Sequence, residues 1–427
     1  MAIGGGTFIT QNKVLPGAYF QFVSRATASA ALSERGIAAI AMDLNWGVDS
    51  KIFTVTASDF SKNSLKIFGY DYSAAEMRNI RELFLHASKL HIYRLNSGGV
   101  AASNDYATAL YPGTRGNDLK VVIQNNLDDE SKFDVSLYFG TVKVDAQTVS
   151  SASDLVANDY VAWKTAELKA TAGTPLTGGT NGTASATSHQ TFLEKMEMYT
   201  DTNAIGYNGA DETIKALYVA FAKRMRDEMG IKLQAVVHGY AGDSIACVNV
   251  KNSADIIPWV TGVIAGTAVN KSATNLTYDG ELEIDTEYTQ SQLEDAIKAG
   301  EFVLHAVNDE VRVLEDINSL VTVTDEQGEL FKDNQTVRVI DNIAISIASV
   351  FAEKYIGKVA NNESGRTSLW SDIIKIHQTL ANIGAIEDFD EEDIVVEQGE
   401  TKKSVVINGA VTVANTMTKL YMCTVVA

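Results

Sequence analysis

Residues 36–42 read Gly-Ile-Ala-Ala-Ile-Ala-Met, and this apolar run predicts a short β-strand. A second strand is predicted at residues 90–95, and a helix that ends near Leu85 is predicted between the two strands. Ser73 is expected to be the N-cap of this helix, because Glu76 follows three residues later and completes a capping box. The alternation of strand, helix and strand predicts an α/β domain.

The α/β pattern returns in the second half of the chain. Residues 213–229 have the apolar spacing of an amphipathic helix, and Gly230 is placed to end it. Two more helices are predicted at residues 336–355 and from Ser364 to Gly384. One face of each carries apolar residues at helical spacing and is expected to pack on a core. The core-face residues are Val337, Ile340, Ala344, Ile347 and Phe351 in the first and Leu369, Ile373, Ile376, Leu380 and Ile383 in the second.

The region between these two parts has a different character. Residues 119–124 and 133–144 are predicted to be strands joined by a hairpin loop at residues 125–130. Residues 171–188 consist almost wholly of Gly, Ser, Thr and Ala, a composition that cannot build a core and predicts a surface loop or linker. We therefore expect an inserted all-β domain at residues 97–188.

The chain has 427 residues, which is too long for one ordinary hydrophobic core, so several domains are expected. The predicted division is an N-terminal arm at residues 1–25, an α/β core in two parts at 26–96 and 189–315, the inserted β domain at 97–188, a C-terminal α+β domain at 316–417 and a C-terminal arm strand at 418–427.

Both ends of the chain are predicted to be extended arms with apolar side chains. The C-terminal strand would be apolar on both faces, which favours burial on both sides. Such a strand is an aggregation hazard in a monomer, whereas it is useful if it completes a sheet. A sheet within the chain and a sheet with another subunit both remain open on this reasoning. The arm residues expected to contact other subunits are Phe8, Ile9, Val14, Leu15, Tyr19, Phe20 and Phe22 and, at the other end, Leu420, Tyr421, Met422, Val425 and Val426.

The charge and the cysteines limit the classes of function. Asp and Glu number 54 against 35 Lys and Arg, a net charge of −19, which argues against partners such as nucleic acid or an anionic membrane surface. Cys247 and Cys423 lie far apart, without the spacing of a metal site or a disulfide framework. The N-terminus lacks the features of a secretory signal, and no apolar run reaches the roughly 18 residues of a membrane span.

Motifs for chemistry are absent from the sequence, and no catalytic residue, cofactor or metal is predicted. It contains no GxxxxGK[ST], GxGxxG, HExxH or GxSxG motif. Residues 238–244, His-Gly-Tyr-Ala-Gly-Asp-Ser, are better interpreted as a glycine-rich turn than as a catalytic triad. The acidic run 387–393 fails the EF-hand pattern, because Asp393 stands where glycine is needed. We interpret this run as a solvated face or as a charge-complementary contact with a neighbouring subunit.

The C-terminal region resembles the C-terminal domain of contractile phage tail sheath proteins. The similarity is strongest from about residue 310 to residue 427, and Pro16-Gly17-Ala18-Tyr19 resembles the N-terminal arm of the same family. The compact size is similar to that of sheaths from Gram-positive myophages and phage-tail-like bacteriocins. The matching pattern comprises Asp333-Asn334, residues 337–343, Phe351, residues 355–358, Asn361, Gly365-Arg366, residues 384–386, Phe389, residues 394–396, Met417 and Leu420-Tyr421.

The resemblance implies a subtilisin-like α/β core without a protease site, an inserted β-sandwich and an α+β C-terminal domain. It implies a structural protein, not an enzyme, which polymerises helically around an inner tube and contracts to drive that tube through a target cell envelope. The arms of the family add strands to a sheet in neighbouring subunits. Residues 26–31 and 409–414 are the expected hinges.

The implied partners are other copies of the chain, the tail tube protein, and the baseplate and tail terminator proteins, with no direct nucleic-acid contact and no membrane insertion. The helix at residues 336–355 and the carboxylates of Asp390, Glu391 and Glu392 are candidates for tube contact. The implied location is a virion tail or a phage-tail-like particle that is assembled in the bacterial cytoplasm. Two other functions remain open: a hydrolase that uses the subtilisin-like core, and a surface-layer or adhesin protein.

Overall fold

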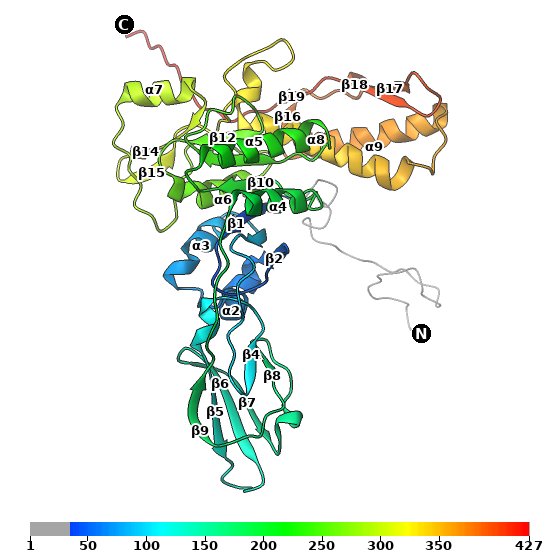
Figure 1. Ribbon diagram of the computed structural model, residues 1–427. Helices are drawn as coiled ribbons and strands as arrows, with labels where there is room; N and C mark the ends of the chain where they lie inside the picture. The colour runs from blue at the N-terminus through cyan, green and yellow to red at the C-terminus, as the bar shows by residue number, and fades with distance from the viewer. Residues whose placement is uncertain (1–34, 427) are drawn as a thin grey trace, which may run out of the picture. The chain divides into compact units, whose positions relative to one another are not determined.

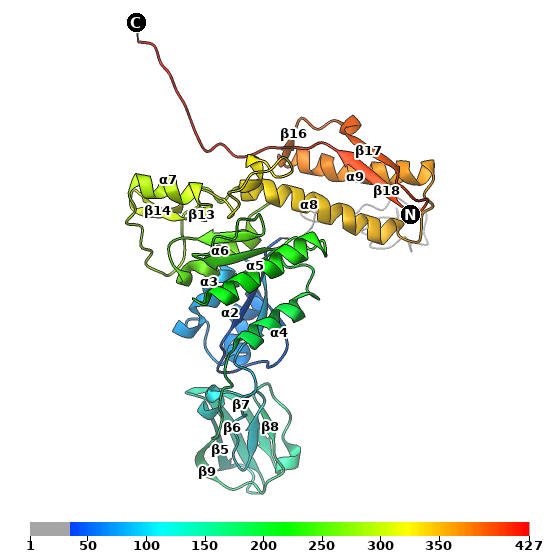
Figure 2. The same ribbon diagram turned by 45° about the horizontal axis from the view of Figure 1, so that its top comes forward.

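The computed structural model describes residues 35–426 (Figures 1 and 2). These residues form two compact units, residues 35–337 with 416–426 and residues 338–415, which are described in turn. The predicted arm contacts at residues 1–25 and the predicted hinge at residues 26–31 lie outside the described residues. No helix in residues 35–426 is both long and apolar enough to cross a membrane.

The first unit is built on a seven-stranded sheet with the order β13-β12-β11-β10-β1-β3-β2. Its strands run parallel, except for β2, which pairs antiparallel with β3 at the edge. The central strands are buried along nearly their whole length, as is typical of parallel sheets covered on both faces. The strands are β1 (Ile37–Met42), β2 (Phe53–Thr56), β3 (Lys89–Arg94), β10 (Ala204–Tyr207), β11 (Gln234–His238), β12 (Cys247–Val250) and β13 (Glu301–Phe302).

Helices cover both faces of this sheet (Figure 2). Because neighbouring side chains of a strand point to opposite faces, Ile40 joins the core under one set of helices and Ala39 the core under the other. Trp259 packs in the first core and Tyr218 in the second, and both side chains are fully buried. The first set is α2 (Ala57–Phe68), α3 (Arg78–Phe84) and α6 (Ile257–Gly266), and the second is α4 (Ala186–Met196) and α5 (Glu212–Asp227).

The helix ends and caps predicted from the sequence agree only in part with the structure. The capping box predicted at Ser73 is not formed: a 3₁₀ turn, Ala75–Met77, precedes α3, and Ala74 at its N-cap provides no side-chain hydrogen bond. Helix α2 was not predicted, although the Thr56 hydroxyl caps it by accepting a hydrogen bond from the Asp59 amide at 3.1 Å. The prediction for residues 213–229 is confirmed by α5.

The inserted region contains a four-stranded antiparallel sheet with the order β7-β6-β5-β9. The single strand predicted at residues 133–144 is wrong, because the chain reverses at Gly140, whose φ of 61° favours glycine. The loop predicted at residues 171–188 is also wrong in part: β9 pairs with β5, and Leu176 is fully buried. The strands are β4 (Ala107–Ala109), β5 (Leu119–Asn125), β6 (Phe133–Phe139), β7 (Val142–Val149), β8 (Val161–Trp163) and β9 (Thr171–Pro175).

The remainder of the first unit consists of α7 (Gln290–Lys298) and the hairpin of β14 (Leu304–Val307) and β15 (Glu310–Val313). From the sequence, residues 290–299 are also predicted to be a helix that ends at Gly300, and α7 confirms this prediction. Its N-cap is Thr289, whose hydroxyl accepts from the Gln292 amide, and the Gln292 side chain accepts from the Thr289 amide in return.

The second unit contains α8 (Asn334–Val350) from Arg338 onward, a π-helical turn at Phe351–Tyr355 and α9 (Glu363–Asn382). Two small antiparallel sheets accompany them, β17 (Ile394–Gln398) with β18 (Val405–Gly409) and β16 (Ile386–Glu387) with β19 (Thr412–Val413). From the sequence, residues 394–397 and 403–408 are also predicted to be strands, and the first sheet confirms both predictions.

Three predictions for the second unit need correction. Asn362, not Ser364, caps α9, because its side chain accepts from the Gly365 amide at 2.9 Å. Ala344, assigned to the core face of α8, is exposed. The expected hinge at residues 409–414 is shortened, because β19 pairs with β16 and the Ala414 amide donates to the Ala385 carbonyl at 3.1 Å.

Candidate functional site

The turn at residues 238–244 organises a neighbouring loop. Asp243 accepts hydrogen bonds from the amides of Val321 and Thr322 at 2.8 and 2.9 Å, and the Ser244 amide donates to the Ser319 hydroxyl. Hydrogen bonds from the Thr322 hydroxyl and from these amides lower the pKa of Asp243. In the structure this segment is the loop between β11 and β12, and its Asp243 and Ser244 hold residues 319–322 in place.

The carboxyl edge of the main sheet is the place where open α/β sheets bind ligands, at the point where the strand order reverses. In this chain the reversal lies between β1 and β10. Residues at the ends of β1 and β3 contact the inserted β domain, since the Asn45 carbonyl accepts from the Arg115 amide and Arg94 donates to the Pro112 carbonyl. Arg94, fully buried at the end of β3, donates to the Pro112 carbonyl at 2.6 Å and to the Asn181 side chain at 3.2 Å. Asn181 in turn donates to the Asn45 side chain at 2.7 Å. These side chains fix the inserted domain where an α/β enzyme would hold a substrate.

Trp46 forms the apolar part of the junction between the α/β core and the inserted β domain. It is fully buried, and its ring centroid lies 5.3 Å from that of Tyr111 and 5.1 Å from that of Phe139. Its indole nitrogen donates to the Lys66 carbonyl at 3.0 Å, so that one side chain joins the core to the insert. Backbones also approach closely: a Cβ on Gly113 would lie 2.0 Å from the Asn45 carbonyl oxygen. Neither Trp46 nor Arg94 belongs to a local motif, so the sequence alone gives no sign of their role at this junction.

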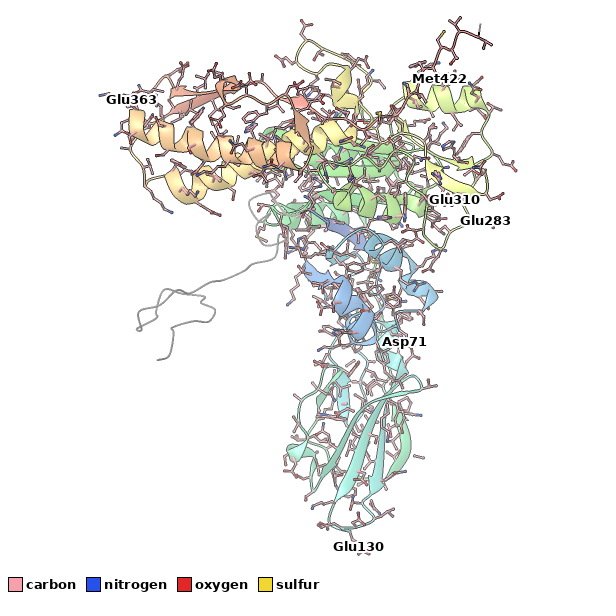
Figure 3. All side chains as sticks on the ribbon, turned by 180° about the vertical axis from the view of Figure 1, so that it is seen from behind. Asp71, Glu130, Glu283, Glu310, Glu363 and Met422 are labelled. Carbon is pink, nitrogen blue, oxygen red and sulfur yellow. The ribbon has the colours of Figure 1, made fainter. Side chains whose placement is uncertain are left out.

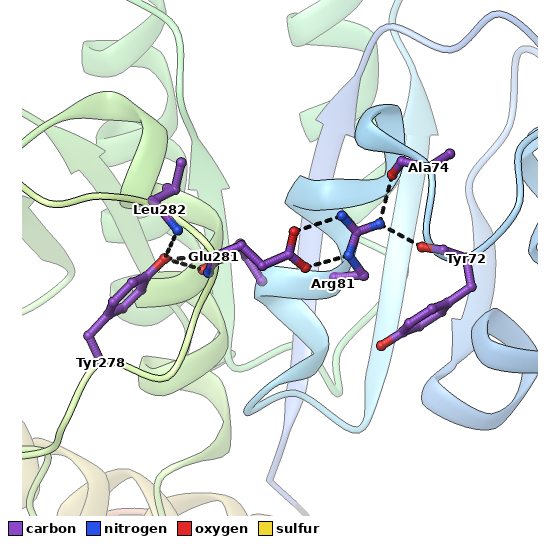
Figure 4. A network of polar contacts seen from close by, with 7 residues as sticks. Tyr72, Ala74, Arg81, Tyr278, Glu281 and Leu282 are labelled. Atoms are coloured by element: carbon purple, nitrogen blue, oxygen red, sulfur yellow. Dashed lines mark hydrogen bonds and ion pairs between the residues drawn. The ribbon is translucent and has the colours of Figure 1, made fainter.

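A polar network ties the segment before α7 to α3 (Figure 4). Glu82 is buried, and its carboxylate accepts from the Tyr278 hydroxyl at 3.0 Å and from the Glu281 amide at 2.6 Å. Arg81 binds the Glu281 carboxylate with two nitrogens, which lowers the pKa of Glu281. Burial, followed by the nearby Glu82 charge, raises the pKa of Tyr278. The network satisfies a buried charge and stabilises the core.

The C-terminal segment differs from the rest of the described chain in its exposure. Residues 414–426 pair with no strand among residues 35–426, so no terminal strand is formed within the described part of the chain. The side chains of Leu420, Tyr421 and Met422 are 90%, 88% and 83% exposed, and Val425 and Val426 are both 89% exposed. Figure 3 shows Met422 on this extended segment. An extended segment whose apolar side chains are exposed to solvent is typical of a segment that docks on a partner surface.

The hairpin of β17 and β18 is a suitable acceptor for an added strand. Within residues 35–426 these strands pair only with each other, so both outer edges are open. The inner face rests on α9 through Ile394, Val396 and Val405, and the Trp370 indole donates to the Ile394 carbonyl at 2.8 Å. Apolar side chains also remain on the hairpin surface, where Val395 is 44% exposed.

The acidic run after β16 forms a capped turn at the surface. Asp390 caps the 3₁₀ turn Glu391–Asp393 by accepting from the Glu392 amide at 3.0 Å. Glu391 accepts from the Gln378 side chain at 2.8 Å, and Asp390, Glu391 and Glu392 are all exposed. No group of three or more His, Cys, Asp or Glu side chains in the described part of the chain could hold a metal ion.

The fold defines a multi-domain α/β protein that carries an inserted β domain. Four family models match successive parts of the chain: "Tail sheath protein Gp18 domain III N-terminal region" at residues 35–95, "Phage tail sheath protein beta-sandwich domain" at 97–181, "Phage tail sheath protein central domain" at 182–319 and "Phage tail sheath C-terminal domain" at 326–427.

Similar proteins and solved structures extend over nearly the whole chain. The phage-like element PBSX protein XkdK of Bacillus subtilis (strain 168) is 32% identical and covers 98% of this chain and 99% of its own length. The crystal structure of a sheath tail protein from Desulfitobacterium hafniense is 35% identical with a TM-score of 0.82, over 95% of this chain and 99% of that chain. That of a Listeria innocua sheath tail protein is 28% identical with a TM-score of 0.80, over 91% and 95%.

The chain belongs to the phage tail sheath protein family. It is a contractile tail sheath subunit and a component of a phage tail or phage-like particle, and it is a structural protein, not an enzyme. The sheath of the anti-feeding prophage in its contracted state has the same fold at 10% identity, with a TM-score of 0.56 over 97% of this chain and 99% of that chain.

Proposed function

We propose that copies of this chain form a helical polymer around a tail tube, connected by strand exchange between neighbours. The observation that carries this proposal is the presence of a donor and an acceptor in one chain: an exposed apolar segment at residues 420–426 and a two-stranded hairpin with open edges. Because donor and acceptor are different surfaces, each added copy exposes a new acceptor. Such heterologous contacts generate helical filaments.

The energy of docking would come from burial of the arm side chains. Burying a Leu, Val or Met side chain contributes about 1.5–3 kcal/mol, and the backbone of an added strand also pairs with the sheet. Part of this gain offsets the loss of freedom of the docked arm. The N-terminal arm would dock as an added strand in the same way. Its apolar residues are Phe8, Ile9, Val14, Leu15, Tyr19, Phe20 and Phe22.

Contraction would move each subunit largely as a rigid body while the arms keep the lattice connected. Arg94 and Trp46 fix the inserted domain to the core and support such rigid motion. The core would be subtilisin-like in topology, supported by its parallel sheet with helices on both faces. We further propose the domain boundaries predicted from the sequence. The proposed partners are the tube, baseplate and tail terminator proteins, and the proposed place of assembly is the bacterial cytoplasm.

Negative-stain electron microscopy of the purified protein tests the polymer directly. We expect rods or striated tubes, and a preparation that stays monomeric at all concentrations would contradict the proposal.

The carboxylates of Asp390, Glu391 and Glu392 are the proposed tube contact, and reversing their charge tests it. We expect the triple substitution to Lys to lower assembly on purified tubes about tenfold, equivalent to about 1.4 kcal/mol, because like charges would face each other. Electron microscopy with added tubes measures the effect.

A control for net charge is the triple substitution of Asp325, Glu326 and Glu329 to Lys, which changes exposed carboxylates of a different loop by the same amount. Both variants should remain folded, apart from about 1 kcal/mol for the lost Asp390 cap. Equal assembly of the two variants on tubes would exclude this surface as the tube contact.

A further inference from the structure

Two lysines on the outer face of the sheet in the inserted domain have no anionic partner among residues 35–426. Lys120 on β5, Tyr138 on β6 and Lys143 on β7 lie directly opposite one another, so their side chains share one face. The ammonium nitrogens of the two lysines lie 5.4 and 5.7 Å from the centroid of the Tyr138 ring. These three residues, the lysine–tyrosine face, present two unneutralised charges around one ring. The remaining lysines of the domain each bind a carboxylate or a carbonyl: Lys132, Lys164 and Lys169.

The side chains of the lysine–tyrosine face are held in place by their surroundings. Val121 and Leu137, which neighbour Lys120 and Tyr138 in their strands, are fully buried on the opposite face of the sheet. The stem of Lys120 rests on β9, since a Cβ on Gly173 would lie 2.8 Å from the Lys120 Cδ. A preformed pair of cations loses less freedom on binding than two mobile lysines.

The loop between β5 and β6 lies at the far end of the inserted domain and carries the opposite charge (Figure 3). Leu127 in this loop is 99% exposed. Asp128 and Glu130 are exposed as well, and neither has a hydrogen bond or an ion pair within residues 35–426. The loop therefore presents one apolar side chain next to two free carboxylates.

The loop is fixed by its own hydrogen bonds. The side-chain oxygen of Asn126 accepts from the amides of Asp128 and Asp129 at 3.0 and 2.9 Å, and its side-chain nitrogen donates to Asp134 at 3.0 Å. Asp129 accepts from the Ser131 amide at 3.0 Å. A rigid loop that exposes a leucine gains the burial of that side chain on docking, with little cost for ordering the loop.

We propose that this loop docks on the lysine–tyrosine face of a second copy of the chain, a contact that rests on the proposed polymer. Leu127 would pack on the Tyr138 ring and on the aliphatic stems of the two lysines. The carboxylates of Asp128 and Glu130 would pair with the two ammonium groups, so that two free anions meet two free cations.

The two surfaces cannot meet within one chain. Tyr138 is separated from Phe133, at the loop end of β6, by a rise of about 17 Å at about 3.4 Å per residue. Because the two surfaces differ and lie at opposite ends of one hairpin, each docked copy exposes a new lysine–tyrosine face or a new loop. Such a contact repeats from copy to copy without closing, as a helical polymer requires.

Charge reversal of each surface, alone and together, tests the contact in the full-length protein. The face variant carries Lys120→Glu with Lys143→Glu, and the loop variant carries Asp128→Lys with Glu130→Lys. Each alone places like charges opposite each other, and we expect the lowest protein concentration that gives rods to rise at least about tenfold. The combined variant restores opposite charges and should assemble within about threefold of the unmodified protein. Sedimentation and electron microscopy measure the rods.

A control for net charge is Lys51→Glu with Lys62→Glu, which reverses two exposed lysines of the α/β core and should leave assembly unchanged. Normal assembly of both single-surface variants, or no recovery in the combined variant, would overturn the contact and leave the polymer intact. An effect of the face variant without one of the loop variant would assign the face to a different partner and also overturn it.

Urea denaturation verifies that each variant keeps the stability of the unmodified protein. A destabilised face variant is replaced by Lys120→Gln with Lys143→Gln, which removes the charges without reversing them and should raise the required concentration about threefold. An unchanged concentration for this neutral variant would again overturn the contact. Failure of the unmodified chain to form rods would instead contradict the proposed function, and the contact with it.

Discussion

Removal of residues 418–427 is expected to abolish polymerisation while the remaining protein stays folded and soluble. The segment makes no strand in its own chain, and its apolar side chains are almost fully exposed, so the fold does not depend on it. A polymer would lose the burial of several side chains per subunit, each about 1.5–3 kcal/mol. We expect rods to fall at least about a hundredfold, equivalent to about 2.7 kcal/mol per contact, as counted by electron microscopy and sedimentation.

A substitution variant separates the loss of apolar contacts from the loss of chain length. Replacing Leu420, Met422 and Val426 with Ser keeps the segment and its backbone, and should reduce assembly nearly as far as the deletion. Replacing Lys419 with Ser alters an exposed polar neighbour and should have little effect. Deletion of residues 1–20 is expected to abolish assembly in the same way. Normal sheaths from the truncated proteins would refute the arm model.

Trp46→Ala is expected to destabilise the junction between the core and the inserted domain by about 3–5 kcal/mol. The side chain is fully buried against Tyr111 and Phe139, and its indole nitrogen donates to the Lys66 carbonyl. Its removal leaves a cavity and an unsatisfied carbonyl between two packed bodies. Urea denaturation of the arm-deleted protein measures the change in the free energy of unfolding.

Trp163→Ala is the matched control, because Trp163 belongs to the insert that Trp46 contacts but is only partly buried. Its indole nitrogen also donates to a backbone carbonyl, that of Val156 at 3.1 Å, so both substitutions remove one hydrogen bond. We expect the loss at Trp163 to be clearly smaller. Equal losses at the two positions, or a loss below about 1 kcal/mol at Trp46, would show that the junction does not depend on this side chain.

Regular elements with strong periodicity were predicted well from the sequence. The strand at residues 37–42 and the helices α5, α7 and α9 appear close to their predicted positions. Errors concentrate at turns and caps. Ser73 carries a valid capping pattern, but a competing 3₁₀ turn starts two residues later. Residues 171–175 have a loop composition and still form β9, because an edge strand gains its hydrogen bonds from β5.

The exposed terminal segment shows what the sequence and the structure each contribute to the site. The sequence showed that residues 420–426 are apolar on both faces, but left open whether they complete a sheet in the same chain or with another subunit. Within residues 35–426 the segment pairs with no strand, and its apolar side chains are exposed. The arm contacts with other subunits stay a prediction.

By itself the sequence determined the α/β class, the inserted β domain, the apolar character of the ends and the family, because periodicity, composition and an ordered residue pattern are properties of the linear chain. Only the tertiary structure decided that Arg94 and Trp46 lock the insert onto the sheet edge, and that residues from Phe351 to Val405 enclose a groove beside an open strand. These features join residues distant in the chain. They depend on packing and on hydrogen bonds that form only when the chain is folded.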